Sequence, residues 1–359
     1  MSTPPLQPHQ ITPEWIAEQL GIPVDDLWAF ARKMETFFYP EKRIPKSEDK
    51  VRIIDPPKRQ AKLFLRRLHG LLQRNRHLFH KSAHGGIARR STFTCVRKHL
   101  GKDFLGKIDV ADCFPSITPT MLLGQLRQRG FGFETSTLLC KLMTIRNRVP
   151  QGSPLSSDAI NLCFYDLDRR EFSRCRAHGC SYTRFIDDFT ISGNDTADMG
   201  LIEILKSEIE SLGLSTNEKS VILNVNSDPM LVHSLDVRRK QGERLKQEHL
   251  ETIHALTGFF VIWCQMASPD NLNFLVELRM ACTGWLNYCR QAQISPAKHI
   301  TRMIKVGDNH VIQRMRKAKV DCKSNKWWTK KALDRIAKIW VKHNSSAENI
   351  PVTVEIFFQ

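Results

Sequence analysis

Apolar and polar positions in the middle of the chain follow two periods, one typical of strands and one typical of helices. The pattern predicts strands at residues 104–110, 182–186, 189–192 and 220–224, and helices at residues 120–129, 156–172 and 199–212. In the second of these helices, Ile160, Phe164 and Leu167 recur at spacings of four and three. Gly213 follows the third, where glycine commonly ends a helix. This order of strands and helices predicts an α+β fold with helices packed on one face of the sheet.

Helical patterns flank this middle region on both sides. Residues 13–38 place Leu27, Phe30, Met34 and Phe37 on one face, with Asp25 expected to cap the second half of the segment. From about residue 243 the chain is helical and increasingly basic, and Trp327, Trp328 and Trp340 are interleaved with lysine and arginine. Basic residues mixed with aromatic ones suit a nucleic-acid backbone and base faces, although a solvated helical face with buried tryptophans is an equally simple interpretation.

Charge narrows the classes of partner. Among 359 residues, 54 Lys and Arg exceed 37 Asp and Glu, and a net charge of +17 predicts a polyanionic partner, either nucleic acid or an anionic membrane surface. The longest apolar-rich stretch, residues 255–267, is too short to span a bilayer, and the first ten residues contain no signal-peptide core. Ten cysteines without a CxxC pair favour free thiols in a reducing cytoplasm. We therefore expect a cytoplasmic protein that does not bind membranes.

Two adjacent carboxylates, Asp187 and Asp188, lie at the expected turn between two short strands. Like charges at short range raise each other's pKa, so a divalent cation between them would be stabilising. A third carboxylate, Asp109, ends a separate predicted strand. Three carboxylates from neighbouring strands can hold a pair of Mg²⁺ ions, although an isolated Asp-Asp pair is more often a solvated turn.

The sequence around these carboxylates resembles reverse transcriptases. Residues 182–192, YTRFIDDFTIS, resemble the YxDD hairpin of bacterial retron and group II intron enzymes, and residues 107–117, KIDVADCFPSI, resemble the first palm motif. Residues 151–157, QGSPLSS, are similar to the QGxPxS loop. Residues 213–219 resemble the fourth palm motif, and Val51 to Ile54 the arginine-bearing fingers motif. The five motifs occur in the family's order and cover roughly residues 40 to 240.

The resemblance implies a right-hand polymerase with fingers, a palm built on an antiparallel sheet, and a helical thumb. The expected parts are an N-terminal helical extension (1–48), fingers (49–103), the first part of the palm (104–130), a fingers and palm segment with the helix after the glycine loop (131–172), the rest of the palm with the hairpin (173–242), and a helical basic thumb with a C-terminal RNA-binding extension (243–359).

Carried over residue by residue, the resemblance implies that Asp109, Asp187 and Asp188 are the catalytic carboxylates and bind two Mg²⁺ ions, with Val110 as a further metal ligand. The residues expected around the incoming nucleotide are Arg52, Asp112, Cys113, Phe114, Gln151, Gly152 and Lys219. Arg52 would grip the outer phosphates, because a guanidinium can donate two hydrogen bonds at once. Lys219 would protonate the pyrophosphate leaving group, or is simply a surface lysine after a turn.

Phe114 lies where this family places its steric gate against the ribose 2′-hydroxyl, so deoxynucleotides are the expected substrates. An RNA-dependent RNA polymerase shares the palm chemistry but must accept ribonucleotides, so this gate makes that alternative less favoured. Phe185 replaces the family's usual tyrosine in the hairpin, which leaves metal binding intact but can alter primer positioning.

His84-Gly85-Gly86 and Arg90-Ser91 resemble a region that retron enzymes use to recognise RNA. The expected RNA-binding residues are Arg89, Arg90, His99, Lys326, Trp327, Trp328, Lys330 and Lys331. Two retron motifs are altered, since Asn-Ala is absent before His99 and residues 231–235, LVHSL, stand where retrons have VTG.

The chain has room for fingers, palm and thumb, and residues 279–288 resemble a thumb helix. We therefore expect a bacterial enzyme that copies its own structured noncoding RNA into an RNA–DNA product from dNTPs, in a retron that acts in anti-phage defence. An effector or toxin protein is a candidate partner. The alternatives are another defence-associated reverse transcriptase, which primes on protein or makes repetitive DNA, and a non-catalytic RNA-binding protein with a polymerase-like palm.

Overall fold

A computed structural model describes residues 6–47, 50–217, 220–223, 230–238, 244–245, 247–268, 271–293 and 296–317. Contacts between Cα atoms group the chain into two compact units, Met1–Glu243 and Arg244–Gln359. Buried apolar side chains fill the interior of each unit.

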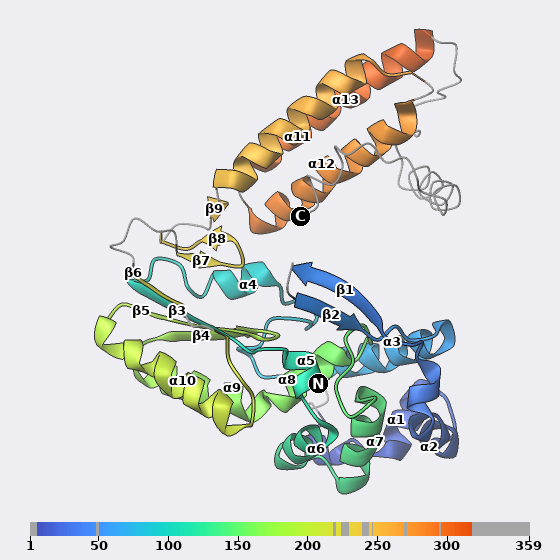
Figure 1. The fold of residues 1–359 in the computed structure, drawn as a ribbon, viewed down its shortest axis with the longest axis vertical. Helices are drawn as coiled ribbons and strands as arrows, with labels where there is room; N and C mark the ends of the chain where they lie inside the picture. The colour runs from blue at the N-terminus through green and yellow to red at the C-terminus, as the bar shows by residue number, and fades with distance from the viewer. Residues whose placement is uncertain are drawn as a thin grey trace, which may run out of the picture. The chain divides into compact units, whose positions relative to one another are not determined.

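A four-stranded antiparallel sheet forms the centre of the first unit (Figure 1). Its strands, in spatial order, are β4 (Ser181–Phe185), β5 (Asp188–Gly193), β3 (Phe104–Asp109) and β6 (Ser220–Leu223). Because β3 pairs with β5 on one side and β6 on the other, it is a central strand, and its Phe104, Leu105 and Ile108 are almost fully buried. A short apolar run bounded by turns is typical of such a strand.

Helices α9 (Tyr165–Ala177) and α10 (Gly200–Ser211) cover one face of this sheet (Figure 1). Ile202 of α10 approaches Gly106 so closely that a Cβ atom there would overlap the isoleucine side chain. Since side chains alternate along a strand, Gly106 and Ile108 face the helices, whereas Lys107 and Asp109 point to the opposite face. The sheet therefore has a helix-covered face and a second face that carries acidic side chains at one end.

The remaining elements of the first unit surround this sheet. A two-stranded ribbon consists of β1 (Lys42–Ser47) and β2 (Lys50–Ile54), and a small hairpin of β7 (Leu231–Val232) and β8 (Leu235–Asp236). The other helices are α1 (Pro13–Leu20), α2 (Val24–Arg32), α3 (Arg59–Arg74), α4 (Thr92–Val96), α5 (Cys113–Ser116), α6 (Pro119–Gln128), α7 (Phe133–Met143) and α8 (Ser156–Cys163). Four 3-10 turns lie at Pro8–Gln10, Met34–Phe37, Arg76–Leu78 and Thr196–Met199.

The second unit begins with the short strand β9 (Arg244–Leu245) and consists mainly of helices α11 (Gln247–Gln265), α12 (Leu272–Ala292) and α13 (Pro296–Lys317). Gly307 on α13 packs directly on the ring of Phe260 on α11. Arg279 on α12 donates to both carboxylate oxygens of Asp308 on α13, at 2.7 and 2.9 Å. None of the helices in the described part of either unit combines the length and apolarity that a membrane crossing requires.

The structure confirms the predicted strands and the mixed α+β architecture, and it corrects two helix predictions. Residues 156–172 form parts of two helices rather than one, because α8 ends and α9 begins at Phe164. The segment 13–38 is likewise divided, since Gly21 adopts a φ of +66° after α1 and Pro23 occupies the N-cap position of α2. Asp25 lies in the first turn of α2 and is not its cap, so that prediction is wrong.

Candidate active site

Two of the three predicted carboxylates lie directly opposite each other. Asp109 is the last residue of β3, Asp188 is the first of β5, and the antiparallel register pairs them. Directly opposed residues in an antiparallel pair have Cβ atoms about 4.5–5.5 Å apart and point to the same face. Both carboxylates therefore lie at one end of the sheet, on the face opposite α9 and α10. The next pair on the same face is Lys107 with Thr190, which brings one positive charge near the acids.

Asp187 completes the group from the turn of the hairpin. Its carbonyl accepts a hydrogen bond from the Val110 amide at 3.2 Å, so the peptide of Asp187 is joined to the end of β3. Ile186, just before it, has a φ of +59°, a conformation that β-branched residues rarely adopt. The surrounding contacts must therefore hold this turn in place.

A further side chain, Asn217, contacts the first carboxylate. Its amide Nδ2 donates to Asp109 Oδ2, and its backbone N–H donates to the Asp109 carbonyl at 2.8 Å. Asn217 lies within the segment that resembles the fourth palm motif, but the sequence assigned it no role. Residues 215–217 lie beside residues 109–111, and the Ala111 amide also donates to the Ser215 carbonyl. The contact of Asn217 with Asp109 depends on this tertiary pairing, so the sequence alone did not predict it.

The electrostatics of Asp188 show how crowded the carboxylates are. Burial raises its pKa to about 6, Lys107 acts against this shift, and the negative charges of Asp187 and Asp109 add to it. The donor set is thus three carboxylates whose mutual repulsion a divalent cation would relieve, which fits Mg²⁺ chemistry. Among the described residues, no group of three or more His, Cys, Asp or Glu side chains is placed so that it could hold a metal ion, so the fit lies in the chemistry of the donors and not in their positions.

Arg184 and Asp168 support the turn from the helix-covered face. Both side chains are fully buried, and the Arg184 guanidinium donates to both oxygens of Asp168, with Nη2 at 2.6 Å from Oδ2. Arg184 Nη1 also donates to the Ile186 carbonyl at 2.8 Å, and the Tyr182 hydroxyl donates to Asp168 Oδ1 at 2.8 Å. This network fixes the peptide immediately before Asp187.

Two glycines pack against the same turn from the side. A Cβ atom on Gly85 would lie 2.6 Å from Cγ1 of Ile186, and Gly86, with φ at +68°, lies against Ser157. The Gly85 carbonyl accepts a hydrogen bond from Asn161 Nδ2 at 2.9 Å, so α8 holds this loop. No larger residue fits at Gly85 unless the turn moves.

His233 contacts the hairpin from the β7–β8 turn. Its ring lies 4.6 Å from that of Phe185, and Nδ1 is 3.9 Å from Asp188 Oδ2. Burial lowers the pKa of His233 to about 4, so the imidazole is neutral near pH 7 and forms no ion pair with Asp188. The two departures from the family motifs, Phe185 and the LVHSL segment, are therefore in contact with each other.

The predicted fingers residues lie near the glycine loop. Arg52 is exposed on β2, and the same strand leads to Asp55, whose amide donates to the Gln151 carbonyl at 2.6 Å. Gly152 has a φ of +119°, and a Cβ atom there would lie 3.0 Å from the Asp55 carbonyl oxygen. The structure thus brings the end of β2, the strand that carries Arg52, against Gln151 and Gly152.

The residues after Asp109 form a short turn and helix. Asp112 is exposed with a φ of +44°, and its carbonyl accepts the Ser116 amide at 3.1 Å. Cys113 is buried, which raises the pKa of its thiol well above the usual value, so its side chain cannot contact a nucleotide and only its backbone can. Phe114 is half-buried and packs against the core.

The predicted RNA-binding residues fall into three groups. Arg89 is exposed. Arg90 instead donates to the carbonyls of His80 and Ala83 and so holds a loop. His99 is fully buried, with its ring nitrogens bonded to Ser192 Oγ and Thr183 Oγ1 at 2.7 Å each. The prediction that His99 contacts RNA is therefore wrong. Lys326, Trp327, Trp328, Lys330 and Lys331 lie outside the described residues, as does Lys219, which was expected to contact the nucleotide.

Comparison with protein families gives a match over residues 44–251 to the model described as reverse transcriptase (RNA-dependent DNA polymerase). This chain belongs to the reverse transcriptase family. The match contains every described strand of the central sheet and strand β2, which carries Arg52. The enzyme is thus an RNA-directed DNA polymerase with a right-hand polymerase fold, divalent-metal-dependent chemistry and an RNA template.

The curated relatives show that this reverse transcriptase is of the retron type. It is 30% identical over 304 residues to the retron Mx65 reverse transcriptase of Myxococcus xanthus, covering 75% of this chain and 71% of that protein. It is 34% identical to the retron Mx162 enzyme of Myxococcus xanthus and 30% identical to the retron Ec86 enzyme of Escherichia coli. These two matches cover 50% and 45% of this chain, and 41% and 52% of the respective relatives.

Solved telomerase structures are also similar. A telomerase from Candida albicans, in complex with a fragment of telomeric RNA, aligns over 93% of this chain and 69% of its own, at a TM-score of 0.43 and 14% identity.

Proposed function

We propose that Asp109, Asp187 and Asp188 are the catalytic carboxylates and that, with Val110, they hold two Mg²⁺ ions. The observation that carries this proposal is the register of the sheet, which sets Asp109 opposite Asp188 with Asp187 joined to the next residue of β3. Bound Mg²⁺ would lower the pKa of a primer hydroxyl and neutralise charge on the triphosphate. The protein supplies the geometry and the negative field.

The incoming nucleotide lies, in this proposal, between the carboxylates and the fingers ribbon. Arg52 binds its outer phosphates, Gln151 and Gly152 contact it, and the backbone from Asp112 to Cys113 lies along the triphosphate. Lys219 serves as the acid for the pyrophosphate. Phe114 excludes ribonucleotides, since its half-buried ring packs against the core and would collide with a 2′-hydroxyl. The substrates are therefore dNTPs.

The template is a structured noncoding RNA, and the product is branched RNA–DNA made in the cytoplasm as part of anti-phage defence, with an effector protein as a further partner. Support comes from the names of the three curated relatives described above, all of which are retron reverse transcriptases. A protein-primed defence enzyme is the second candidate, favoured by the LVHSL segment, which departs from the retron motif and places His233 against the catalytic hairpin.

The test compares nucleic acid that copurifies with the wild-type protein and with the Asp187→Asn, Asp188→Asn double variant. We expect DNA covalently joined to RNA from the wild type and RNA alone from the double variant. Asp103→Asn is the matched control, because Asp103 is an exposed acid just before β3. If ribonuclease leaves the DNA product unchanged but proteinase removes a protein attached to its end, the enzyme primes on protein. Equal DNA yield from the double variant would disprove the catalytic assignment.

A further inference from the structure

A basic pocket lies on the helix-covered side of the palm. Its volume is about 560 Å³, and it is lined by His80 and Lys81, which precede the loop beside β4, and by α9 residues that include Arg169, Phe172 and Arg176. None of these residues belongs to the candidate active site. Because α9 packs on the sheet face opposite Asp109 and Asp188, a ligand in this pocket would lie away from the carboxylates.

At this pocket Lys81 lies over a cluster of rings, Phe172, His80 and Tyr165, which continues beyond the lining to Arg129. Lys81 Nζ lies 4.1 Å from the ring centre of Phe172, which is 5.5 Å from the ring of His80. His80 in turn lies 5.6 Å from Tyr165, and the Arg129 guanidinium is 3.7 Å above the Tyr165 ring. Rows of positive charges and flat rings are typical of surfaces that bind the backbone and bases of nucleic acid.

The arginines of α9 differ in how they are neutralised. Arg170 and Arg174 pair with Glu208 of α10 at 2.8 and 3.1 Å, and Arg174 also pairs with Glu171. On the pocket side, Arg169 contacts Asp166 at 3.2 Å but keeps an exposed side chain. Within the part of the chain that the structure describes, no carboxylate pairs with Lys81 or Arg176. The arginines of α9 next to α10 are therefore paired with glutamates, whereas Arg176 on the pocket side can contact an anionic ligand.

The rest of the cluster is held rigidly. Burial lowers the pKa of His80 to about 4, so His80 acts as a neutral ring, and its Nδ1 bonds to Ser82 Oγ at 2.8 Å. Arg90 donates to the His80 carbonyl and fixes the loop. A site of this kind needs little reorganisation to bind an anion.

We propose that this pocket binds the phosphate backbone of the RNA partner, at a segment that is not being copied. The inference rests on the proposed function, which supplies the RNA. Lys81, Arg169 and Arg176 contact successive phosphates, and the half-buried ring of Phe172 beside them stacks on an unpaired base. A structured RNA anchored here would stay bound while its template segment passes the carboxylates on the other face.

The test measures binding of a fluorescein-labelled oligouridine by anisotropy as a function of salt. The variant Lys81→Gln, Arg169→Gln, Arg176→Gln should bind about tenfold more weakly at physiological salt, and its slope of log affinity against log salt should fall by about 2, as expected for three lost phosphate contacts on a single strand. DNA synthesis on a short preformed RNA template–primer should be unchanged, because that substrate needs only the carboxylate side.

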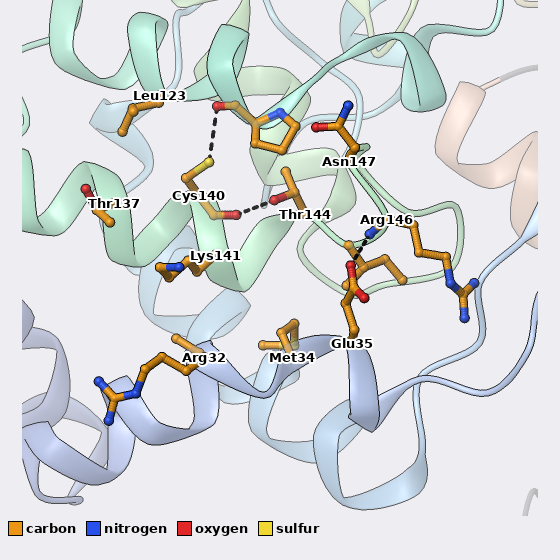
Figure 2. A pocket seen from close by; sticks show the side chains of 13 residues that line it. Arg32, Met34, Glu35, Leu123, Thr137, Cys140, Lys141, Thr144, Arg146 and Asn147 are labelled. Atoms are coloured by element: carbon orange, nitrogen blue, oxygen red, sulfur yellow. Dashed lines mark hydrogen bonds between the residues drawn. The ribbon is translucent and has the colours of Figure 1, made fainter.

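A matched control removes three charges elsewhere in the same unit. A second pocket has a volume of about 410 Å³. Its lining includes Arg32, Lys141 and Glu35 (Figure 2), and Glu35 accepts a hydrogen bond from the Arg146 amide at 2.6 Å. The variant Arg32→Gln, Lys33→Gln, Lys141→Gln, in which Lys33 is an exposed neighbour of the lining, has the same net charge as the test variant. This second pocket has no aromatic lining. It should bind oligouridine as the wild type does.

Three results would overturn the proposal. They are equal weakening by the test and control variants, no weakening by the test variant, and an equal loss of binding to labelled polyglutamate, which would indicate a general polyanion surface. If the triple variant does not fold, single Lys81→Gln and Arg176→Gln variants should each lower the salt slope by about 0.7. A wild-type protein that binds RNA but makes no DNA would contradict the proposed function and leave this site standing.

Discussion

At the scale of single residues, the buried Arg184–Asp168 pair is the main support of the turn that leads to Asp187. Removing one partner from a buried ion pair leaves a charge without compensation, and such changes cost about 3–5 kcal/mol. We therefore expect Asp168→Asn to lower the free energy of unfolding, measured in urea, by about that amount. Glu210→Gln, which removes the exposed pair with Lys206, is the control and should cost about 0.5 kcal/mol or less.

A second variant separates stability from positioning. Replacing both partners by apolar residues, Asp168→Leu with Arg184→Met, removes the buried charges together and should recover much of the stability. The Ile186 carbonyl would still lack the Arg184 donor, so DNA synthesis should stay low while the urea midpoint rises. Synthesis at the wild-type rate in this double variant would show that Arg184 serves the fold and not the turn.

At the scale of elements, the close contact of α10 with β3 depends on one glycine. A methyl group at Gly106 would overlap Ile202, and overpacking of this kind costs about 1–3 kcal/mol. Gly106→Ala should therefore lower the melting temperature, and Ile202→Val in the same chain should restore part of it. Gly124→Ala is the matched control, since nothing lies within 4 Å of a Cβ atom at Gly124 in α6, and it should be neutral or stabilising.

Periodicity predicted the elements of the palm well, because each has one buried face and a short sequence is enough to show it. It did not predict helix α3, because the many Lys and Arg residues in this segment obscure the helical spacing of the buried Leu65, Leu68 and Leu72. It also could not show contacts between distant segments. The pairing of Asp109 with Asp188 was expected from motif order, but the contact of His233 with Phe185 required the β7–β8 turn to lie against the hairpin. Such contacts depend on tertiary packing and have no local signature.

At the scale of the whole molecule, several histidines are buried in the neutral form. Burial lowers the pKa of His80 and His84 to about 4 and that of His99 to about 3, whereas an exposed histidine titrates near 6.5. The groups around them explain this, since His99 bonds to two hydroxyls and His84 Nδ1 to Thr94 Oγ1, and none of these partners is a carboxylate.

These shifts give stability a defined dependence on pH. Below about pH 6.5 these histidines are protonated in the unfolded chain but neutral in the folded chain, so the unfolded state binds more protons. The free energy of unfolding therefore decreases as the pH is lowered from about 6.5 to the folded pKa values. Each histidine contributes up to about 1.4 kcal/mol per pH unit in that window. The urea midpoint should therefore fall steeply from about pH 6.5 to pH 4.5, and the His99→Gln variant should show a smaller slope than the wild type. His178→Gln is the control, because His178 is exposed and pairs with Asp198, and it should leave the loss of stability with acid nearly unchanged. A slope that is the same in all three proteins would mean that His99 is not neutral in the folded state.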